Sequence, residues 1–165
     1  QVERNESIQL APMVEEIFTD LTPLAEKSGI TLELAGDGVM TGSDALIYRM
    51  IFNLTENAIK YNRPDGSVQV CITQKPEKLL ILVSDTGRGI PEEYQQSIFQ
   101  PFFRVDKSRS RTFGGAGLGL ALVWEIAALH GGSVRVAESS DSGTTIAAEL
   151  PRSGNHAAAP KNETL

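Results

Sequence analysis

Four polar side chains recur on one face of a helix predicted between Ser43 and Asn62. The row consists of Asn53, Asn57, Lys60 and Tyr61, spaced i, i+4, i+7 and i+8. At about 100° per residue these positions fall within one narrow sector of the helix. The apolar stripe of the same helix begins inside that sector and contains Leu46, Ile47, Met50, Ile51, Leu54 and Ala58. Because burying an amide costs free energy unless it is hydrogen-bonded, we expect the row to face a ligand.

The chemistry of these four side chains suits a nucleotide. The Lys60 ammonium can neutralise phosphate, and the Tyr61 ring can lie against a purine. The Asn57 amide oxygen can bind Mg²⁺, which takes few protein ligands where phosphates supply the rest. Asn53 can orient a metal-bound water beside it. The alternative is a helix edge with unrelated polar residues, and the row alone does not decide between the two.

Asp85 ends a predicted strand and is followed by Thr-Gly-Arg-Gly. Gly87 and Gly89 allow the backbone to approach a ligand closely. A carboxylate held there accepts a hydrogen bond from an exocyclic amine such as adenine N6, whereas guanine presents a carbonyl at that position. Taken alone, an Asp-Thr-Gly turn made only for its geometry is the simpler interpretation.

A second glycine-rich segment, Gly114–Leu120, opens a predicted helix at 118–130. Backbone N–H groups at a helix N-terminus suit a polyphosphate, although glycines there also allow tight helix packing. The dinucleotide pattern does not fit, because the segment follows a long loop and no acidic residue lies about 20 positions on. The preceding loop carries a net charge of +3 over residues 104–111. A loop this long is typically a lid, and its basic side chains would reach the β- and γ-phosphates.

The periodicities predict one mixed sheet covered by helices, an α/β sandwich. Helices are expected at 12–27 (kinked at Pro23), 44–62, 91–98 and 118–130. Strands are expected at 7–10, 30–34, 67–74, 78–85, 133–137 and 144–150, with a turn at 36–38.

Composition excludes several function classes for this 165-residue chain. The net charge of −6 disfavours a general nucleic-acid or acidic-membrane binder. A single cysteine, Cys71, excludes an internal disulfide, and two histidines make a zinc site improbable. No apolar run approaches the roughly 20 residues of a membrane span, and no signal peptide is visible.

Together, the motifs resemble the ATP-binding catalytic domain of sensor histidine kinases, in the gyrase/chaperone/histidine kinase/mismatch-repair (GHKL) superfamily. The matching segments are Asn53–Asn62 (N box), Asp85–Pro91 (G1 box), Phe99–Arg104 (F box), Gly115–Gly119 (G2 box), Leu129–Gly132 and Gly143–Thr145. The resemblance implies the Bergerat-type fold: a mixed sheet of about five or more strands, covered on one face by about three helices, with a mobile ATP lid.

The resemblance also implies roles for individual residues. Asn53 and Arg104 would be catalytic, with Arg104 near the γ-phosphate, and Asn57 would bind Mg²⁺. The residues implied to contact ATP are Asn57, Lys60, Tyr61, Asp85, Gly87, Gly89, Ile90, Lys107, Gly115, Gly117, Leu118 and Gly119. Ala116 departs from the pattern, since many of these kinases carry Thr there.

The implied organisation is the end of a linker at 1–6, the ATP-binding domain at 7–151 and a disordered tail at 152–165. The family's phosphoacceptor helix is absent, and neither His130 nor His156 suits its role. We therefore expect the chain to bind Mg-ATP and donate the γ-phosphate to a histidine on a separate dimerisation domain, in cis or in trans, with a response regulator downstream. We expect a cytoplasmic location and no contact of this chain with nucleic acid or membrane.

Two alternatives remain open. An ATPase of the gyrase, chaperone or mismatch-repair type carries Glu where this chain has Asn53, and an amide cannot act as general base toward water. A non-catalytic nucleotide-binding regulatory module would retain the site without the transfer.

Overall fold

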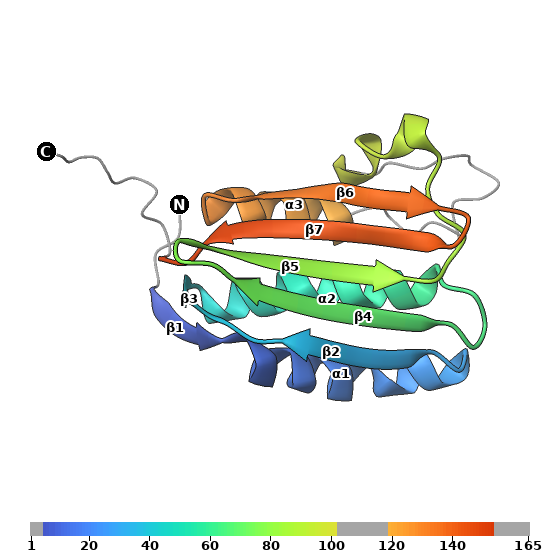
Figure 1. The fold of residues 1–165 in the computed structure, drawn as a ribbon, viewed down its shortest axis with the longest axis horizontal. Helices are drawn as coiled ribbons and strands as arrows, with labels where there is room; N and C mark the ends of the chain where they lie inside the picture. The colour runs from blue at the N-terminus through green and yellow to red at the C-terminus, as the bar shows by residue number, and fades with distance from the viewer. Residues whose placement is uncertain (1–4, 102–118, 154–165) are drawn as a thin grey trace, which may run out of the picture.

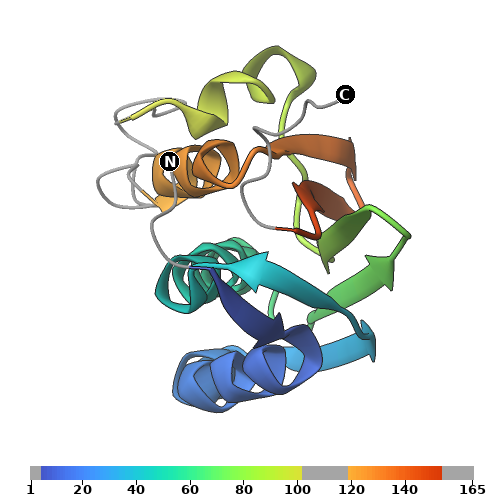
Figure 2. The same ribbon diagram turned by 90° about the vertical axis from the view of Figure 1, so that its left-hand side faces the viewer.

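The computed structural model describes residues 5–101 and 119–153, which form a mixed five-stranded sheet, a small two-stranded sheet and three α-helices (Figure 1). The sheet order is β2 (Thr31–Gly36), β4 (Ser67–Gln74), β5 (Lys78–Asp85), β7 (Gly143–Pro151) and β6 (Ser133–Ser140). β2 and β4 are parallel, and the other neighbours are antiparallel. The helices are α1 (Leu10–Lys27), α2 (Asp44–Lys60) and α3 (Gly119–Leu129). All three lie on one side of the sheet (Figure 2), which confirms the predicted α/β sandwich.

The alternating pattern of β4 and β5 explains why only one face of the sheet is covered. Side chains that point toward the helices, such as Val70 and Ile81, are fully buried. Their neighbours on the opposite face, such as Gln69 and Cys71, are exposed or half-buried. Since successive strand residues point to opposite faces, one apolar set of side chains is enough to bind the helical layer. The bounds of both strands agree with the prediction.

α2 is the central helix and contacts both α1 and α3. Its N-cap is Ser43, and the Ser43 hydroxyl accepts a hydrogen bond from the Leu46 N–H at 3.3 Å. The cap satisfies a backbone donor that the helix itself cannot pair. The predicted apolar stripe is buried apart from half-buried Leu46, so the helix has the expected rotation.

Some boundaries were wrong. The chain after the 36–38 turn forms β3 (Val39–Gly42), which pairs antiparallel with β1 (Glu6–Gln9) in a small second sheet. β3 was not predicted, because four residues are too few to show a periodicity. The predicted helix at 91–98 is instead two short 3₁₀ turns, η1 (Glu92–Tyr94) and η2 (Ser97–Phe99). α2 ends at Lys60, two residues before the predicted end, and α1 begins at Leu10, two residues before the predicted start.

His130 joins the end of α3 to the start of α2. The imidazole is fully buried, and its Nε2 accepts a hydrogen bond from the Ser43 N–H at 3.1 Å. Nδ1 must then carry the proton, which it donates to the Ile126 carbonyl at 2.9 Å. Burial lowers the pKa of this imidazole below its usual value. His130 is thus held as a neutral structural residue.

None of the helices in the described ranges is long and apolar enough to cross a membrane.

Candidate functional site

The polar row lies along α2 at the edge of its buried face, as predicted. Asn53 and Asn57 are half-buried, and the Asn53 side-chain amide donates a hydrogen bond to the Gly119 carbonyl of α3 at 3.4 Å. No residue in the described ranges forms a hydrogen bond with the side-chain amide of Asn57, so the oxygen of this side chain is available to a ligand. Lys60 is exposed and lies 3.8 Å from the Glu56 carboxylate, an ion pair of small energetic weight. The row therefore extends along α2 from Asn53, which contacts the start of α3, to the C-terminal end of α2.

Tyr61 is the C-cap of α2 and half-buried. Burial, assisted by the nearby negative charge of Glu56, raises the pKa of its phenol to about 12. The hydroxyl therefore stays protonated at neutral pH, and the ring offers an apolar surface at the end of the row.

Asp85, at the C-terminal end of β5, is half-buried and oriented by the backbone. Its Oδ1 accepts hydrogen bonds from the Gly87 N–H at 2.8 Å and from the Thr144 N–H at 3.2 Å. Burial raises the pKa of the carboxyl above its usual value, although both hydrogen bonds act in the opposite direction. Oδ2 accepts no hydrogen bond from any residue in the described ranges. A half-buried acceptor that is fixed in this way suits an amine donor from a ligand.

Gly87 allows the turn after β5 to lie against the end of α2. A Cβ built at Gly87 would stand 2.4 Å from the Tyr61 carbonyl oxygen and 3.1 Å from Asp85 Oδ1. Only glycine fits so close to another backbone, which brings the Asp85 carboxylate and the Tyr61 cap to the same place. Gly89 has a φ of +86°, and a Cβ there would stand 2.2 Å from the Ser140 carbonyl oxygen.

The β6–β7 hairpin contacts the turn after β5 on the side opposite α2. Sequence reasoning missed this contact. The Ser139 hydroxyl accepts a hydrogen bond from the Ile90 N–H and pairs with the Thr144 hydroxyl, both at 2.8 Å. Thr144, buried, also binds Asp85 through its N–H. The available signal was the Gly143–Thr145 motif, to which no site role was assigned. The hairpin therefore completes the support of the Asp85 carboxylate.

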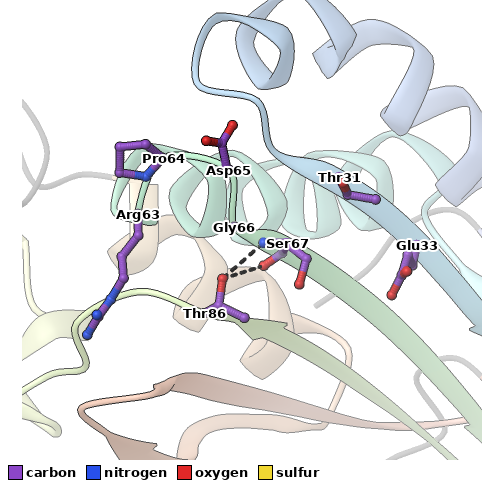
Figure 3. Close-up of a pocket in the computed structure, with 8 residues that line it drawn as sticks. All are labelled: Thr31, Glu33, Arg63, Pro64, Asp65, Gly66, Ser67 and Thr86. Carbon is purple, nitrogen blue, oxygen red and sulfur yellow. Dashed lines mark hydrogen bonds between the residues drawn. The ribbon is translucent and has the colours of Figure 1, made fainter.

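A surface pocket of about 480 Å³ lies next to this turn (Figure 3). Its lining residues are Thr31, Glu33, Arg63, Pro64, Asp65, Gly66, Ser67 and Thr86. The pocket contains none of the α2 row, so it is distinct from the candidate site. No group of three or more His, Cys, Asp or Glu residues within the described ranges could hold a metal ion by itself. A cation at the site would need oxygen ligands from a bound anion as well as from the protein.

Comparison with known proteins places this chain in a family. Residues 42–154 match the model of the histidine kinase-, DNA gyrase B- and HSP90-like ATPases. The chain belongs to this family. More narrowly, it is a GHKL-type ATP-binding domain of the histidine-kinase branch, because the relatives described below are sensor histidine kinases and its fold is that of the solved sensor histidine kinase MprB.

Two relatives illustrate the similarity of this ATP-binding domain in sequence. The sensor histidine kinase RppB of Synechocystis is 34% identical over 145 residues, which cover 86% of this chain and 32% of RppB. The sensor-like histidine kinase SenX3 of Mycolicibacterium smegmatis is 40% identical over 110 residues, or 67% of this chain and 29% of SenX3. The chain thus spans about a third of the length of these curated relatives.

Among solved structures, the mycobacterial sensor histidine kinase MprB superposes with a TM-score of 0.78 at 27% identity, over 91% of this domain and 99% of that chain. The catalytic domain of the histidine kinase ThkA has a TM-score of 0.77 at 23% identity, over 91% and 98% of the two chains. The second likeness supports the fold alone.

The structure brings together those site residues that α2 and the turn after β5 supply, with Gly119 at the start of α3. Five residues implied by the family resemblance lie outside the described residues: Arg104, Lys107, Gly115, Gly117 and Leu118. The predicted lid, residues 1–4 of the predicted linker and the tail from 154 onward lie outside them as well.

Proposed function

We propose that the domain binds Mg-ATP between α2 and the turn after β5, and that in the complete kinase it presents the γ-phosphate to a histidine on a separate dimerisation domain. The observation that carries this proposal is the orientation of the Asp85 carboxylate. Two backbone N–H groups occupy Oδ1, and Oδ2 is left for a donor. An exocyclic amine such as adenine N6 supplies that donor, whereas guanine O6 would meet the carboxylate as a second acceptor.

The other residues of the site fall into two groups, one that contacts the base and one that contacts the phosphates. Gly87 and Tyr61 form the wall beside Asp85 and bind the base. The Lys60 ammonium, exposed at the same end of α2, neutralises phosphate. Gly119 begins α3, and the N-terminal end of a helix favours anions, so the phosphates are expected to extend toward it.

Mg²⁺ fits the donor set. The Asn57 amide oxygen has no protein partner in the described ranges, and amide oxygen is a ligand type that Mg²⁺ accepts. When bound, Mg²⁺ neutralises negative charge on the phosphates and so favours their transfer. Asn57 would hold the ion, and Asn53 beside it would orient a water.

Transfer to a histidine is favoured over hydrolysis by the amide at Asn53. An amide takes up no proton at neutral pH, so it cannot activate water as a general base. An acceptor imidazole needs only positioning and charge stabilisation. One neighbour in fold, ThkA, was solved with the response regulator TrrA. We propose corresponding partners for this chain and a cytoplasmic location. The predicted linker at 1–6 and tail at 152–165 are too long by the residues that the structure places: Glu6 belongs to β1, and the Arg152 carbonyl accepts a hydrogen bond from the Thr41 N–H at 2.7 Å.

Calorimetry on the 165-residue chain tests the binding step. We expect a Kd for ATP in the micromolar-to-millimolar range that tightens with Mg²⁺, and much weaker binding of GTP. No ³²P should remain on the chain after incubation with [γ-³²P]ATP. Equal affinity for ATP and GTP would contradict the assignment of Asp85.

Fusing the chain to an acceptor-helix domain tests the transfer step. Acid-labile, alkali-stable ³²P on the acceptor histidine is the expected product. Efficient release of inorganic phosphate by the isolated chain would instead favour the ATPase alternative. Binding without transfer in the fusion would favour a regulatory module.

A further inference from the structure

The side chains of Asn62 and Thr86 and the backbone of Ser67 form a hydrogen-bond network between the loop after α2 and the turn after β5. The Thr86 hydroxyl donates to Asn62 Oδ1 at 2.8 Å and accepts from the Ser67 N–H at 2.9 Å. The Asn62 amide nitrogen donates to the Ser67 carbonyl at 2.9 Å. Figure 3 shows Thr86 below and to the left of Ser67, and both residues line the surface pocket. The loop end of α2, the start of β4 and the turn are thereby tied at one point.

Gly66 lies close against the network, although the Thr86 side chain is exposed to solvent. Asn62 Oδ1 accepts a second hydrogen bond, from the Arg63 N–H at 2.8 Å. A Cβ built at Gly66 would stand 2.3 Å from Asn62 Oδ1 and 2.4 Å from the Thr86 hydroxyl. The glycine therefore leaves just enough room for the Asn62–Thr86 hydrogen bond. Alternative rotamers of either side chain would break at least two hydrogen bonds.

Each partner in that hydrogen bond adjoins a residue of the candidate site. Asn62 follows Tyr61, and Thr86 lies between Asp85 and Gly87. The Tyr61 carbonyl is also the atom against which Gly87 is packed. Adjacent residues share a rigid peptide bond, so fixing Asn62 and Thr86 also restricts the positions of Tyr61 and Asp85. The network therefore sets the separation between the Tyr61 wall and the Asp85 carboxylate.

We infer that Asn62 and Thr86 are positioning residues for the base of the bound nucleotide. This inference rests on the proposed ATP site. Neither side chain touches the base; they hold the two walls at the spacing that an adenine requires. Loss of the Thr86 hydroxyl lets the turn move away from α2, and affinity for the base falls. Affinity for the phosphates does not fall, because it depends on Lys60 and Asn57.

A matched control exists one residue away from Asp85. The hydroxyls of Ser84 and Thr145 are also paired at 2.8 Å, and they join β5 to β7 within the sheet. This pair supports the sheet but does not connect the turn to α2. Removing it costs one hydroxyl hydrogen bond of similar length without affecting the spacing of the site.

The test compares Thr86→Val, Thr86→Ser and Ser84→Ala in the 165-residue chain. Calorimetry measures the affinities for Mg-ATP, Mg-ADP and inorganic triphosphate, and urea denaturation measures stability. For Thr86→Val we expect ATP and ADP affinities about five- to tenfold weaker, the effect of one or two lost hydrogen bonds, with triphosphate affinity unchanged. Thr86→Ser, which keeps the hydroxyl, and Ser84→Ala should bind ATP within about twofold of the unmodified chain.

Three results would overturn the inference. These are ATP affinity unchanged in Thr86→Val, equal losses for ATP and triphosphate, or an equal loss in Ser84→Ala. If Thr86→Val does not fold, Asn62→Ala carries the same test, because it removes the hydrogen bonds from the Asn62 side chain to Thr86 and Ser67 without adding a charge. We expect it to weaken ATP and ADP about threefold and triphosphate not at all. Failure of the unmodified chain to bind ATP would instead refute the proposed function.

Discussion

The carboxylate of Asp85 accepts a hydrogen bond, at 3.2 Å, from the backbone N–H of Thr144, which lies 59 residues further along the chain. This contact joins the end of β5 to the start of β7, beside the shorter bond from the Gly87 N–H. Both donors use Oδ1, so the carboxyl plane is fixed before any ligand arrives. Preorganised acceptors bind more tightly because no ordering is left to be done on binding.

Asp85→Asn should separate binding from stability. The amide oxygen can replace Oδ1 for both backbone donors, and the half-buried charge is removed. Because the folded-state pKa of Asp85 is raised, its ionisation destabilises the fold as pH rises above the usual value of 3.8. We expect an unchanged or higher free energy of unfolding at pH 7, measured by urea denaturation. ATP affinity should fall at least about tenfold, since an N–H now faces the adenine amine.

The same variant also tests the choice of base. An amide N–H in place of Oδ2 can donate to guanine O6, so the ratio of GTP to ATP affinity should rise. Unchanged ATP affinity in a folded Asp85→Asn variant would remove Asp85 from the site.

Gly87→Ala should damage the site through backbone contact. The new Cβ would meet the Tyr61 carbonyl oxygen at 2.4 Å, and a backbone atom cannot rotate away as a flexible side chain would. The turn must therefore move from α2, with an expected loss of about 1–3 kcal/mol in stability. ATP affinity, measured by calorimetry on the folded fraction, should fall about tenfold or more. Full retention of affinity would show that Asp85 and Tyr61 need not be held together.

Asn57→Ala should abolish the metal-dependent part of ATP binding. The side-chain amide of Asn57 has no hydrogen-bond partner in the described ranges, and Ala is the better helix former. The free energy of unfolding should therefore stay equal or rise by about 0.5 kcal/mol. In Mg²⁺ the variant should bind ATP more weakly than the unmodified chain. In EDTA the two affinities should agree. A difference that persists in EDTA would assign Asn57 to direct contact with the nucleotide instead.

Stability should fall as His130 becomes protonated. Its folded-state pKa lies below the usual value of about 6.5, so below that pH the unfolded chain binds a proton that the native one does not. The free energy of unfolding should be level above about pH 7, and it should decline from about pH 6.5 down to the folded-state pKa.

His130→Gln should lose this slope, and His156→Gln, which removes the chain's other histidine, should keep it. NMR should find the neutral Nδ1–H tautomer of His130 in the unmodified chain below pH 6.5. A His130 ring that titrates at its ordinary pKa would contradict the buried geometry.

Local patterns were enough to predict much of the fold and part of the site. The strands at 67–74 and 78–85 and the polar face of α2 follow from periodicity, because side chains alternate in strands and repeat every 3.6 residues in helices. The short β3 escaped prediction since its pairing with β1 is not visible within four residues.

By itself, the sequence determined which groups the chain offers: a row of amides and an ammonium on one helix, and a carboxylate ahead of a glycine turn. Only the tertiary structure decided how they are held. The bonds from Thr144 to Asp85 and from Thr86 to Asn62 depend on strand register and on the approach of a loop to a turn. Residues far apart in the chain acquire such relations only when the sheet is assembled, because no local rule of spacing encodes the distance between two backbones.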